Sequence, residues 1–220
     1  MRQLVIDTAT EALSVALLDD GRVIASHHEI AGRGHAEKLM PIIAAMENGG
    51  RADEIIANHG PGSFTGVRVG LAAARALAYA WGVPLRAYGS LSLIASMARK
   101  QDMPAGNESL SSDIIVTMNG GHGEIFWQIF DRLTLFPKTQ PTSTAIAELA
   151  GQGHKGPFYG TAALTLVEAQ GYGDATHIHP DARAFTDLPV HLIHADVMPL
   201  YGRGADAIPI DQRPQKQKEK

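Results

Sequence analysis

The chain has 220 residues, of which 45% are hydrophobic and 19% charged, with a formal net charge of −4 at pH 7. This composition fits one sizeable core or two small lobes, and it excludes a global positive field that would attract nucleic acid. The absence of cysteine excludes disulfides, zinc–thiolate sites and cysteine nucleophiles, and it fits a reducing cytoplasm. The N-terminus reaches Asp7 too early for a signal peptide, and the longest apolar stretch, 71–81, is too short to span a bilayer. We therefore expect a cytoplasmic protein with no membrane association.

The first hundred residues predict strands first and then strands alternating with helices. Residues 3–7 form a short apolar strand, and 12–30 form two strands joined at Asp19-Asp20-Gly21, because an aspartate–glycine pair between β-rich runs indicates a hairpin. Residues 34–47 have apolar side chains at helical spacing, with a kink or early turn at Pro41. The remaining elements expected in this half are a strand in 52–60, a helix from about 66 to 81 that stops at Gly82, a strand in 83–89 and a helix in 90–100.

The second half repeats the opening pattern of the chain. Residues 101–112 are polar and rich in breakers, which indicates a connection between lobes. Residues 113–131 then predict two apolar strands around the turn "NGGHG", which echoes the first hairpin and indicates an internal duplication. Residues 142–152 look helical, 157–163 look like strand and turn, and 180–196 are ambiguous because Pro189 interrupts them. We therefore expect an N-terminal lobe over 1–104, a smaller C-terminal lobe over 105–210 and a disordered tail over 211–220.

The stretch "GPGSFTGVRVG", residues 60–70, has the strand–glycine loop–helix arrangement that many proteins use to hold phosphate. The P-loop pattern fails, because Gly66 is followed by valine and arginine instead of lysine and a hydroxyl residue. The dinucleotide pattern fails because three residues separate Gly62 from Gly66. What remains is a helix N-terminus that either holds an anion or is capped by Ser63 or Thr65, and the capping interpretation is the more frequent one.

A second candidate is the aspartate that ends the first strand in "VIDTATEALSVALLDDG". An aspartate followed by small hydroxyl residues and another strand resembles the phosphate and Mg²⁺ site of the actin, sugar-kinase and heat-shock ATPase superfamily. There Asp7 would hold metal-bound water, and the backbone around Thr8 and Thr10 would hold phosphate. The alternative is that Asp7 caps its own turn. Asn119 occupies the matching position of the second half, and a neutral amide lacks the charge to share a magnesium ion. We therefore expect no cofactor and no catalytic residues.

The histidines and a row of small residues are further candidate sites. Two histidine pairs could meet on a metal, but no neighbouring aspartate has a recognisable ligand spacing; the pairs are His177-x-His179 and His191-x-x-His194. His35 has Leu39, not a second histidine, four residues later, so we expect a surface or interface residue and no metal. Small side chains also line one row of the helix over 66–81, where another helix could approach closely, while Leu71 and Leu77 would face the sheet; the row is Gly66, Gly70, Ala74 and Ala78, with Ala73 beside it.

Taken together, these strings resemble the TsaB family, the partner proteins in bacterial synthesis of threonylcarbamoyladenosine on tRNA. The matching strings are "IDTAT", "SVALLDDG", "GHAEKLMPII", "GPGSFTGVRVGLAAARALA" and "PLYGRGADA". The resemblance covers the first hundred residues nearly continuously and the second half thinly. There the family usually carries an aspartate and an arginine in the turn that holds Asn119, and a bulkier residue at Gly202.

This resemblance implies a shortened actin-like α/β fold of two lobes, each with a mixed sheet and helices. It implies a non-catalytic scaffold that binds the catalytic subunit TsaD as a heterodimer, with the ATPase TsaE joining the pair and tRNA reached only through the complex. Alone, the chain would form a homodimer through its first-lobe helices. The alternative is a small actin-like nucleotide-dependent phosphotransferase or ATPase that uses Asp7 and the 60–66 loop.

Two residue sets follow from these interpretations. The expected partner interface comprises His35, Leu39, Ile42, Met46, Gly70, Ala73, Ala74 and Ala78. The candidate vestigial phosphate loop comprises Asp7, Thr8, Gly62, Ser63, Thr65 and Gly66.

Overall fold

The structure, a computed structural model, describes residues 1–32, 34–102 and 113–201. Three predictions lie outside these ranges: most of the connection expected over 101–112, the part of "PLYGRGADA" beyond residue 201, and the tail over 211–220.

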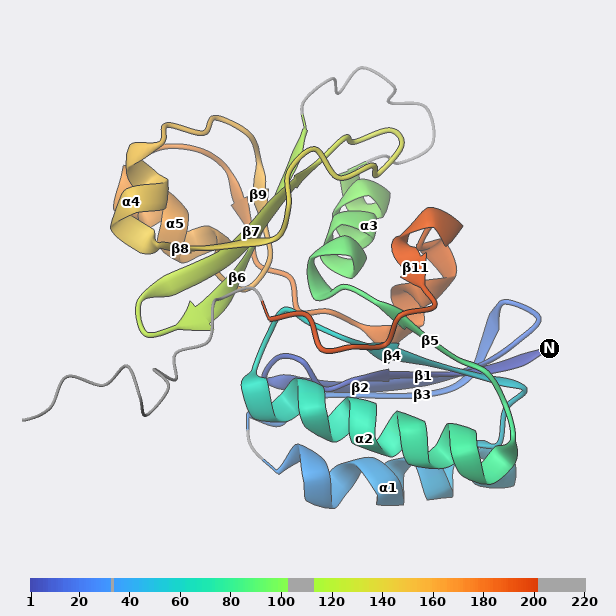
Figure 1. Ribbon diagram of the computed structural model, residues 1–220. Coiled ribbons are helices and arrows are strands. Elements are labelled where there is room, and N and C mark those ends of the chain that lie inside the picture. The colour runs from blue at the N-terminus through green and yellow to red at the C-terminus, as the bar shows by residue number, and fades with distance from the viewer. Residues whose placement is uncertain (33, 103–112, 202–220) are drawn as a thin grey trace, which may run out of the picture.

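The first sheet has six strands in the order β11-β5-β4-β1-β2-β3 (Figure 1). The strands are β1 (Arg2–Asp7), β2 (Ala12–Asp19), β3 (Arg22–Ile30), β4 (Glu54–Asn58), β5 (Leu85–Tyr88) and β11 (Ile193–His194). β1, β2 and β3 are antiparallel neighbours, whereas β4 and β5 run parallel to β1. The hairpin predicted between β2 and β3 is confirmed. Its turn residues Asp20 and Gly21 have φ values of 46° and 74°, the positive angles that a two-residue turn of this twist requires.

Helices α1 (His35–Ala45) and α2 (Phe64–Trp81) lie side by side on one face of this sheet, with a short 3₁₀ turn, η1 (Glu47–Gly50), after α1 (Figure 1). Pro41 lies within α1. The predicted stop of α2 is confirmed, because Gly82 caps its C-terminus with a left-handed φ of 68°. The helix begins two residues earlier than expected, at Phe64, because Ser63 is its N-cap.

The second sheet repeats the strand order of the first. Its order is β10-β9-β6-β7-β8. β6 pairs with the antiparallel β7 on one side and the parallel β9 on the other, just as β1 pairs with β2 and β4 in the first sheet. The elements are β6 (Ile114–Gly121), β7 (Glu124–Phe130), β8 (Thr142–Ala145), α4 (Ile146–Gly151), β9 (Phe158–Tyr159), α5 (Ala163–Gln170) and β10 (Ala175–Thr176). The predicted duplication is therefore present in the topology. Residues 142–145 are a strand and not the expected helix, because they pair with β7, Thr142 opposite Trp127.

Helix α3 (Ser90–Asp102) packs against β6, β7 and β9 of the second sheet, although it follows directly from β5 of the first (Figure 1). One apolar cluster runs through it and includes residues of both sheets. Its members include Val5, Ala16, Leu18 and Ile56 of the first sheet, Leu91, Ile94 and Ala98 of α3, and Ile114, Val116, Met118 and Phe130 of the second. The two lobes therefore share a core and do not meet only at a hinge.

The last described residues return to the first sheet. After the 3₁₀ turns η2 (Ala182–Asp187) and η3 (Val190–Leu192), strand β11 pairs with β5. Pro189, which made this region ambiguous, is the residue before η3. A single C-terminal lobe over 105–210 was expected; β11 shows that this part of the chain also contributes a strand to the first sheet.

Candidate functional site

A cleft of about 1260 Å³ lies between the lobes. Its walls come from the turn after β1, the start of α1, the loop and first turns of α2, and the β6–β7 turn. The lining includes Thr10, Glu11, His35, Glu37, Gly62, Ser63, Phe64, Thr65, Gly66, Arg68, Asn119, His122, Phe126 and Tyr201. The cleft thus lies between the glycine loop of the first lobe and the β6–β7 turn of the second, the turn whose Asn119 the sequence analysis matched to Asp7. Asp7 and Thr8 are absent from its walls.

The glycine loop packs tightly against the end of β1. The Ser63 hydroxyl accepts a hydrogen bond from Gly66 N at 3.2 Å, which confirms the capping interpretation. A side chain at Gly62 would overlap the carbonyl oxygen of Ala9, and one at Gly66 would overlap that of Thr8. Neither glycine has a positive φ angle, so backbone conformation does not require glycine here. Glycine is required because the two backbones approach each other too closely for a side chain.

Asp7 is fully buried and its carboxylate is occupied by the protein itself. Asn58 Nδ2 donates to Oδ2 at 2.7 Å, the Tyr88 hydroxyl donates to Oδ2 at 2.9 Å, and Ala9 N donates to Oδ1 at 3.1 Å. Asn58 is held in turn, since its Oδ1 accepts from Gly60 N at 2.7 Å. Burial raises the pKa of Asp7 above its ordinary value, against the opposing effect of these hydrogen bonds. Of the two sequence interpretations, the geometry favours an aspartate that holds its own turn over one that faces a metal-bound water.

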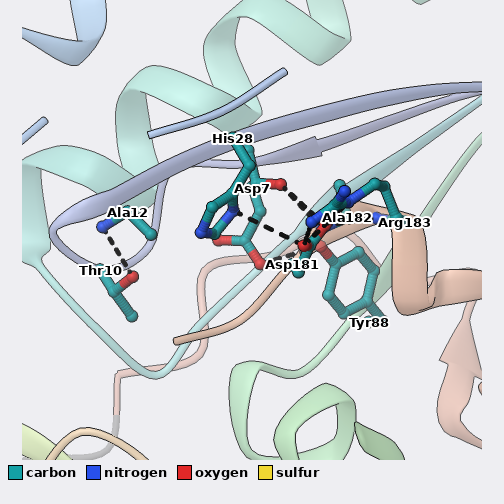
Figure 2. A network of polar contacts seen from close by, with 9 residues as sticks. Asp7, Thr10, Ala12, His28, Tyr88, Asp181, Ala182 and Arg183 are labelled. Carbon is teal, nitrogen blue, oxygen red and sulfur yellow. Dashed lines mark hydrogen bonds and ion pairs between the residues drawn. The ribbon is translucent and has the colours of Figure 1, made fainter. Parts of the chain in front are cut away.

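A second acidic group, Asp181, lies near Asp7 on the segment that crosses between the lobes (Figure 2). Arg183 N donates to its Oδ1 at 2.9 Å, and His28 Nδ1 lies 3.9 Å from Oδ2. Burial would raise the pKa of Asp181, but the hydrogen bonds from Arg183 outweigh it and hold the pKa below the ordinary value. Ser14 links this segment to β2, because its hydroxyl accepts from Ala182 N at 2.8 Å. These polar contacts tie the crossing segment to the first sheet.

Among the described residues, the histidines are not grouped with other possible ligands as a metal site requires. His35 was expected at a surface or interface, but it is only 9% exposed, at the start of α1 and in the wall of the cleft. The two rings of the His177–His179 pair do meet, with 2.9 Å between their Nε2 atoms. Within the described ranges, no three histidine, aspartate or glutamate side chains are grouped so that they could hold a metal ion. In the same ranges, no helix is long and apolar enough to cross a membrane.

The row of small residues on α2, where the sequence analysis expected that another helix could approach, faces the interior of the first lobe in this structure. A side chain at Gly70 would overlap the Thr8 hydroxyl, and Ala74 is fully buried. The other members, Gly66 and Ala78, are buried too, as is Leu71, whereas Leu77 and Ala73 are half-buried. The apolar side chains expected at an interface on α1 also pack into the first lobe's own cluster; these are Leu39, Ile42, Ile43 and Met46. Of the predicted interface set, none is well exposed in this structure.

The outward faces of the two helices carry different residues. Ala72, Ala76 and Ala80, four residues apart, are exposed along α2, and Met40 and Ala44 are exposed along α1. Residues at this spacing lie on one face of a helix. The sequence shows this second alanine row, but the spacing alone does not tell which row faces the sheet.

Sequence reasoning missed a cluster at the mouth of the cleft. The guanidinium carbon of Arg68 lies 3.4 Å from the centre of the Phe64 ring, and the Tyr201 hydroxyl accepts hydrogen bonds from Arg68 Nε and Nη2 at 3.1 and 2.9 Å. Phe64 and Arg68 are one helical turn apart, which was a usable signal. Tyr201 lies 133 residues further along the chain, and nothing local indicated that it reaches α2.

The fold and the cleft define a class, the two-lobed actin-like α/β proteins, in which a duplicated mixed sheet encloses a cleft. A crystal structure from Pseudomonas aeruginosa, described as an uncharacterized protein with similarity to peptidase YeaZ, shares this arrangement with a TM-score of 0.73 and 25% identity. The comparison covers 92% of this chain and 99% of that one.

Sequence comparisons show which family within this class the chain belongs to. The protein-family model for "TsaD: tRNA N6-adenosine threonylcarbamoyltransferase" matches residues 22–171. The tRNA threonylcarbamoyladenosine biosynthesis protein TsaB of Escherichia coli K12 is 34% identical over 137 residues, covering 60% of this chain and 56% of that protein. TsaB of Haemophilus influenzae is 40% identical over 101 residues, covering 43% of this chain and 42% of the relative. The chain thus aligns with about half the length of these curated relatives. The chain belongs to the family that this model describes and, within it, to the TsaB proteins.

Proposed function

We propose that the chain takes part in the biosynthesis of threonylcarbamoyladenosine on tRNA as a non-catalytic scaffold that binds TsaD. The names of its relatives support the pathway. The observation that carries the non-catalytic role is the state of Asp7, whose carboxylate is buried and already accepts three hydrogen bonds from its own chain. A Mg²⁺ ion needs oxygen ligands that face water or phosphate, which this carboxylate does not. The exposed Asn119 in the second lobe adds no charge to replace it.

The shared core supports the same role. Catalysis in a two-lobed ATPase commonly needs the lobes to close on the nucleotide. Here α3 packs against the second sheet and one apolar cluster includes residues of both sheets. Arg132, which is 3% exposed, donates from the second lobe to the Asp102 carboxylate at the end of α3 at 2.7 Å. These contacts resist the domain movement that an active kinase or ATPase would use, so they count against the phosphotransferase alternative.

For the partner surface, we propose the outward faces of α1 and α2. Both helices lie on the outer side of the first sheet, away from the second lobe (Figure 1). The exposed alanines at 72, 76 and 80 let a facing helix approach closely, and the apolar Met40 lies on the neighbouring helix. The same surface would serve a homodimer when the chain is alone and TsaD in the cell. TsaE would join the pair, and tRNA would be reached only through the complex.

The scaffold proposal is tested with one pair of tryptophan substitutions. Ala76→Trp places a bulky ring on the outward face, so we expect a folded monomer with weakened TsaD binding. Ala74→Trp, on the buried face of the same helix, must instead disrupt the lobe, because Ala74 has no exposed surface. Light scattering gives the mass, a pull-down with TsaD gives the binding, and circular dichroism reports folding.

Catalysis is tested separately on the purified chain. We expect no ATP hydrolysis above background. The scaffold role is abandoned if hydrolysis appears and is lost in Asp7→Asn, and the surface assignment is abandoned if Ala76→Trp remains dimeric and fully competent for TsaD. As a control, His154→Ala, on the second lobe, should change neither mass nor binding.

A further inference from the structure

A pair of histidine rings lies on the segment that crosses from the second lobe back to the first. His177 follows β10 directly, and its Nε2 lies 2.9 Å from Nε2 of His179. The two rings meet edge to face, with 4.7 Å between their centres. Ile178, between them, is buried in the apolar cluster that the two sheets share, which holds the backbone of the pair in place.

The contact between the two rings requires that one Nε2 carries a proton and the other lacks one. His179 Nδ1 is buried and has no hydrogen-bond partner among the described residues, whereas His177 is exposed. Buried N–H groups without an acceptor are rare in proteins, so the proton of the His179 ring belongs on Nε2. His179 Nε2 therefore donates the hydrogen bond, and the unprotonated Nε2 of His177 accepts it.

Protonation of the exposed ring removes this hydrogen bond. His177 would take the additional proton on the nitrogen that accepts from His179, so two N–H groups would face each other across 2.9 Å. A change of tautomer does not relieve the clash, because His179 Nδ1 has no acceptor. Burial, and then the neighbouring His177, lower the pKa of His179, against the opposing effect of Glu11. Histidine gains its charge within the physiological range of pH, so this contact is sensitive to pH in that range.

The other charged groups around the pair come from the β1–β2 turn, from β3 and from the start of η2. Glu11, in the turn, lies 4.0 Å from His179 Nε2. His28 Nδ1, on β3, lies 3.9 Å from Asp181 Oδ2, and Arg183 Nε donates to the same oxygen at 2.9 Å (Figure 2). Protonation of the histidines would place three cationic rings and a guanidinium beside two carboxylates. The excess of positive charge then opposes the packed arrangement.

We propose that His177 and His179 form a pH-sensitive clasp, which keeps the crossing segment docked on the first lobe while both rings are neutral and loosens it when His177 is protonated. The docking contact lies just beyond the pair, where Ala182 N donates to the hydroxyl of the fully buried Ser14 at 2.8 Å. The way in which the second lobe is held against the first thus depends on pH. All groups of the clasp belong to one chain, so it is independent of TsaD binding.

The amide of Ala182 reports on this docking contact. Its hydrogen exchange is measured by NMR on the whole chain at pH 7 and pH 5, as protection relative to an unstructured peptide at the same pH. EDTA is present throughout, because two neighbouring histidine nitrogens attract stray metal ions. We expect the protection of Ala182 to fall by about tenfold or more at pH 5, the factor that one pKa unit represents. The control amide is Ile55 N, which donates to Pro84 O at 3.0 Å within the first lobe and should keep its protection.

Two substitutions at His177 separate the charge from the loss of the ring. His177→Gln accepts a hydrogen bond but takes up no proton, so Ala182 should keep its neutral-pH protection at pH 5. His177→Lys carries a permanent charge and should show at pH 7 the low protection that the wild type shows at pH 5. His154→Gln is the matched control, because His154 Nε2 contacts the neutral side chain of Gln152 at 3.2 Å, and it should respond to pH like the wild type.

Circular dichroism checks that each variant is folded. The clasp is rejected if wild-type Ala182 has the same protection at both pH values, or if His177→Gln retains the wild-type dependence on pH. It is also rejected if His177→Lys is as well protected at pH 7 as the wild type. A parallel loss of protection at Ile55 would show general unfolding in acid and would equally contradict a local clasp.

Discussion

The two lobes have the same strand order but use the ends of their first strands differently. In the first lobe, β1 ends in Asp7, which is buried among Asn58, Tyr88 and Ala9. In the second, β6 carries Asn119 at the matching place, and this residue is exposed in the wall of the cleft. The comparison shows that a duplicated topology does not preserve a duplicated site. In the first lobe the carboxylate at the strand end has a structural role, whereas in the second lobe the matching residue is a neutral amide that faces solvent.

The largest effect is expected where backbones touch. In both lobes a glycine that follows the fourth strand of the repeat closely approaches another backbone segment. Gly62 lies against the carbonyl of Ala9, just after β1, and Gly160 lies against the carbonyl of Thr117 in β6. We expect Gly66→Val, in the same first-lobe contact, to destabilise the protein by about 3 kcal/mol or more, because the side chain would overlap the Thr8 carbonyl. Chemical denaturation measures this. Gly151→Ala, where no atom lies within 4 Å of the added carbon, should leave stability within about 0.5 kcal/mol of wild type.

The next-largest effect compares the stability lost by substitution at the end of β1 with that lost at the matching place in β6. Asp7→Ala leaves the donors of Asn58, Tyr88 and Ala9 buried without an acceptor, which should cost about 3 kcal/mol of unfolding free energy. Asn119→Ala, at an exposed position, should cost less than about 0.5 kcal/mol. Urea denaturation of both variants measures the difference. Equal losses in the two variants would contradict the contrast between the lobes.

A smaller effect removes one donor only. Tyr88→Phe deletes the hydroxyl that donates to Asp7 Oδ2 and leaves the ring in the core. Burial raises the pKa of Tyr88 well above its ordinary value, so the hydroxyl is protonated and available as a donor at neutral pH. We expect a loss of about 1 kcal/mol, measured as a lower urea midpoint. A Tyr88→Phe variant as unstable as Asp7→Ala would show that the phenol, and not the carboxylate, organises the cluster.

The smallest expected effect is a dependence of the unfolding free energy on pH. Because burial raises the pKa of Asp7, the folded state holds this proton more tightly than the unfolded state does. The contribution of Asp7 to stability is therefore full below its ordinary pKa of 3.8 and falls as pH rises through the folded value. Unfolding free energies measured from pH 4 to 7 should decline more steeply for wild type than for Asp7→Asn. Parallel curves would mean that the hydrogen bonds fully offset the burial.

Much of this architecture is readable from the sequence, because local signals and tertiary packing agree. The Asp20-Gly21 turn, the Gly82 stop and the second hairpin around residues 119–123 are set by backbone conformations that few other residues adopt. The duplication follows from those hairpins. Residues 142–145 were misassigned because a strand of four residues has no periodicity that separates it from the start of a helix.

The candidate site was harder to predict. The glycine loop and its Ser63 cap were found, because capping is a local contact between residues three positions apart. The inward orientation of the Gly66–Ala78 row was not, since α2 has small residues on opposite sides and only packing decides between them. The burial of Asp7 depends on Asn58 and Tyr88, which lie 51 and 81 residues away. Contacts at such separations leave no local signal.

Strand β11 has a consequence for how the chain is made. The first sheet offers the outer edge of β5 for pairing, and that edge is covered by residues 193–194, more than a hundred residues later. During synthesis, the first lobe can assemble its helices and five strands while this edge is still bare. An unpaired strand edge is a template for pairing with other chains. Until β11 has left the ribosome, the nascent first lobe is therefore exposed to edge-to-edge association, and truncation before residue 193 should yield an aggregation-prone product.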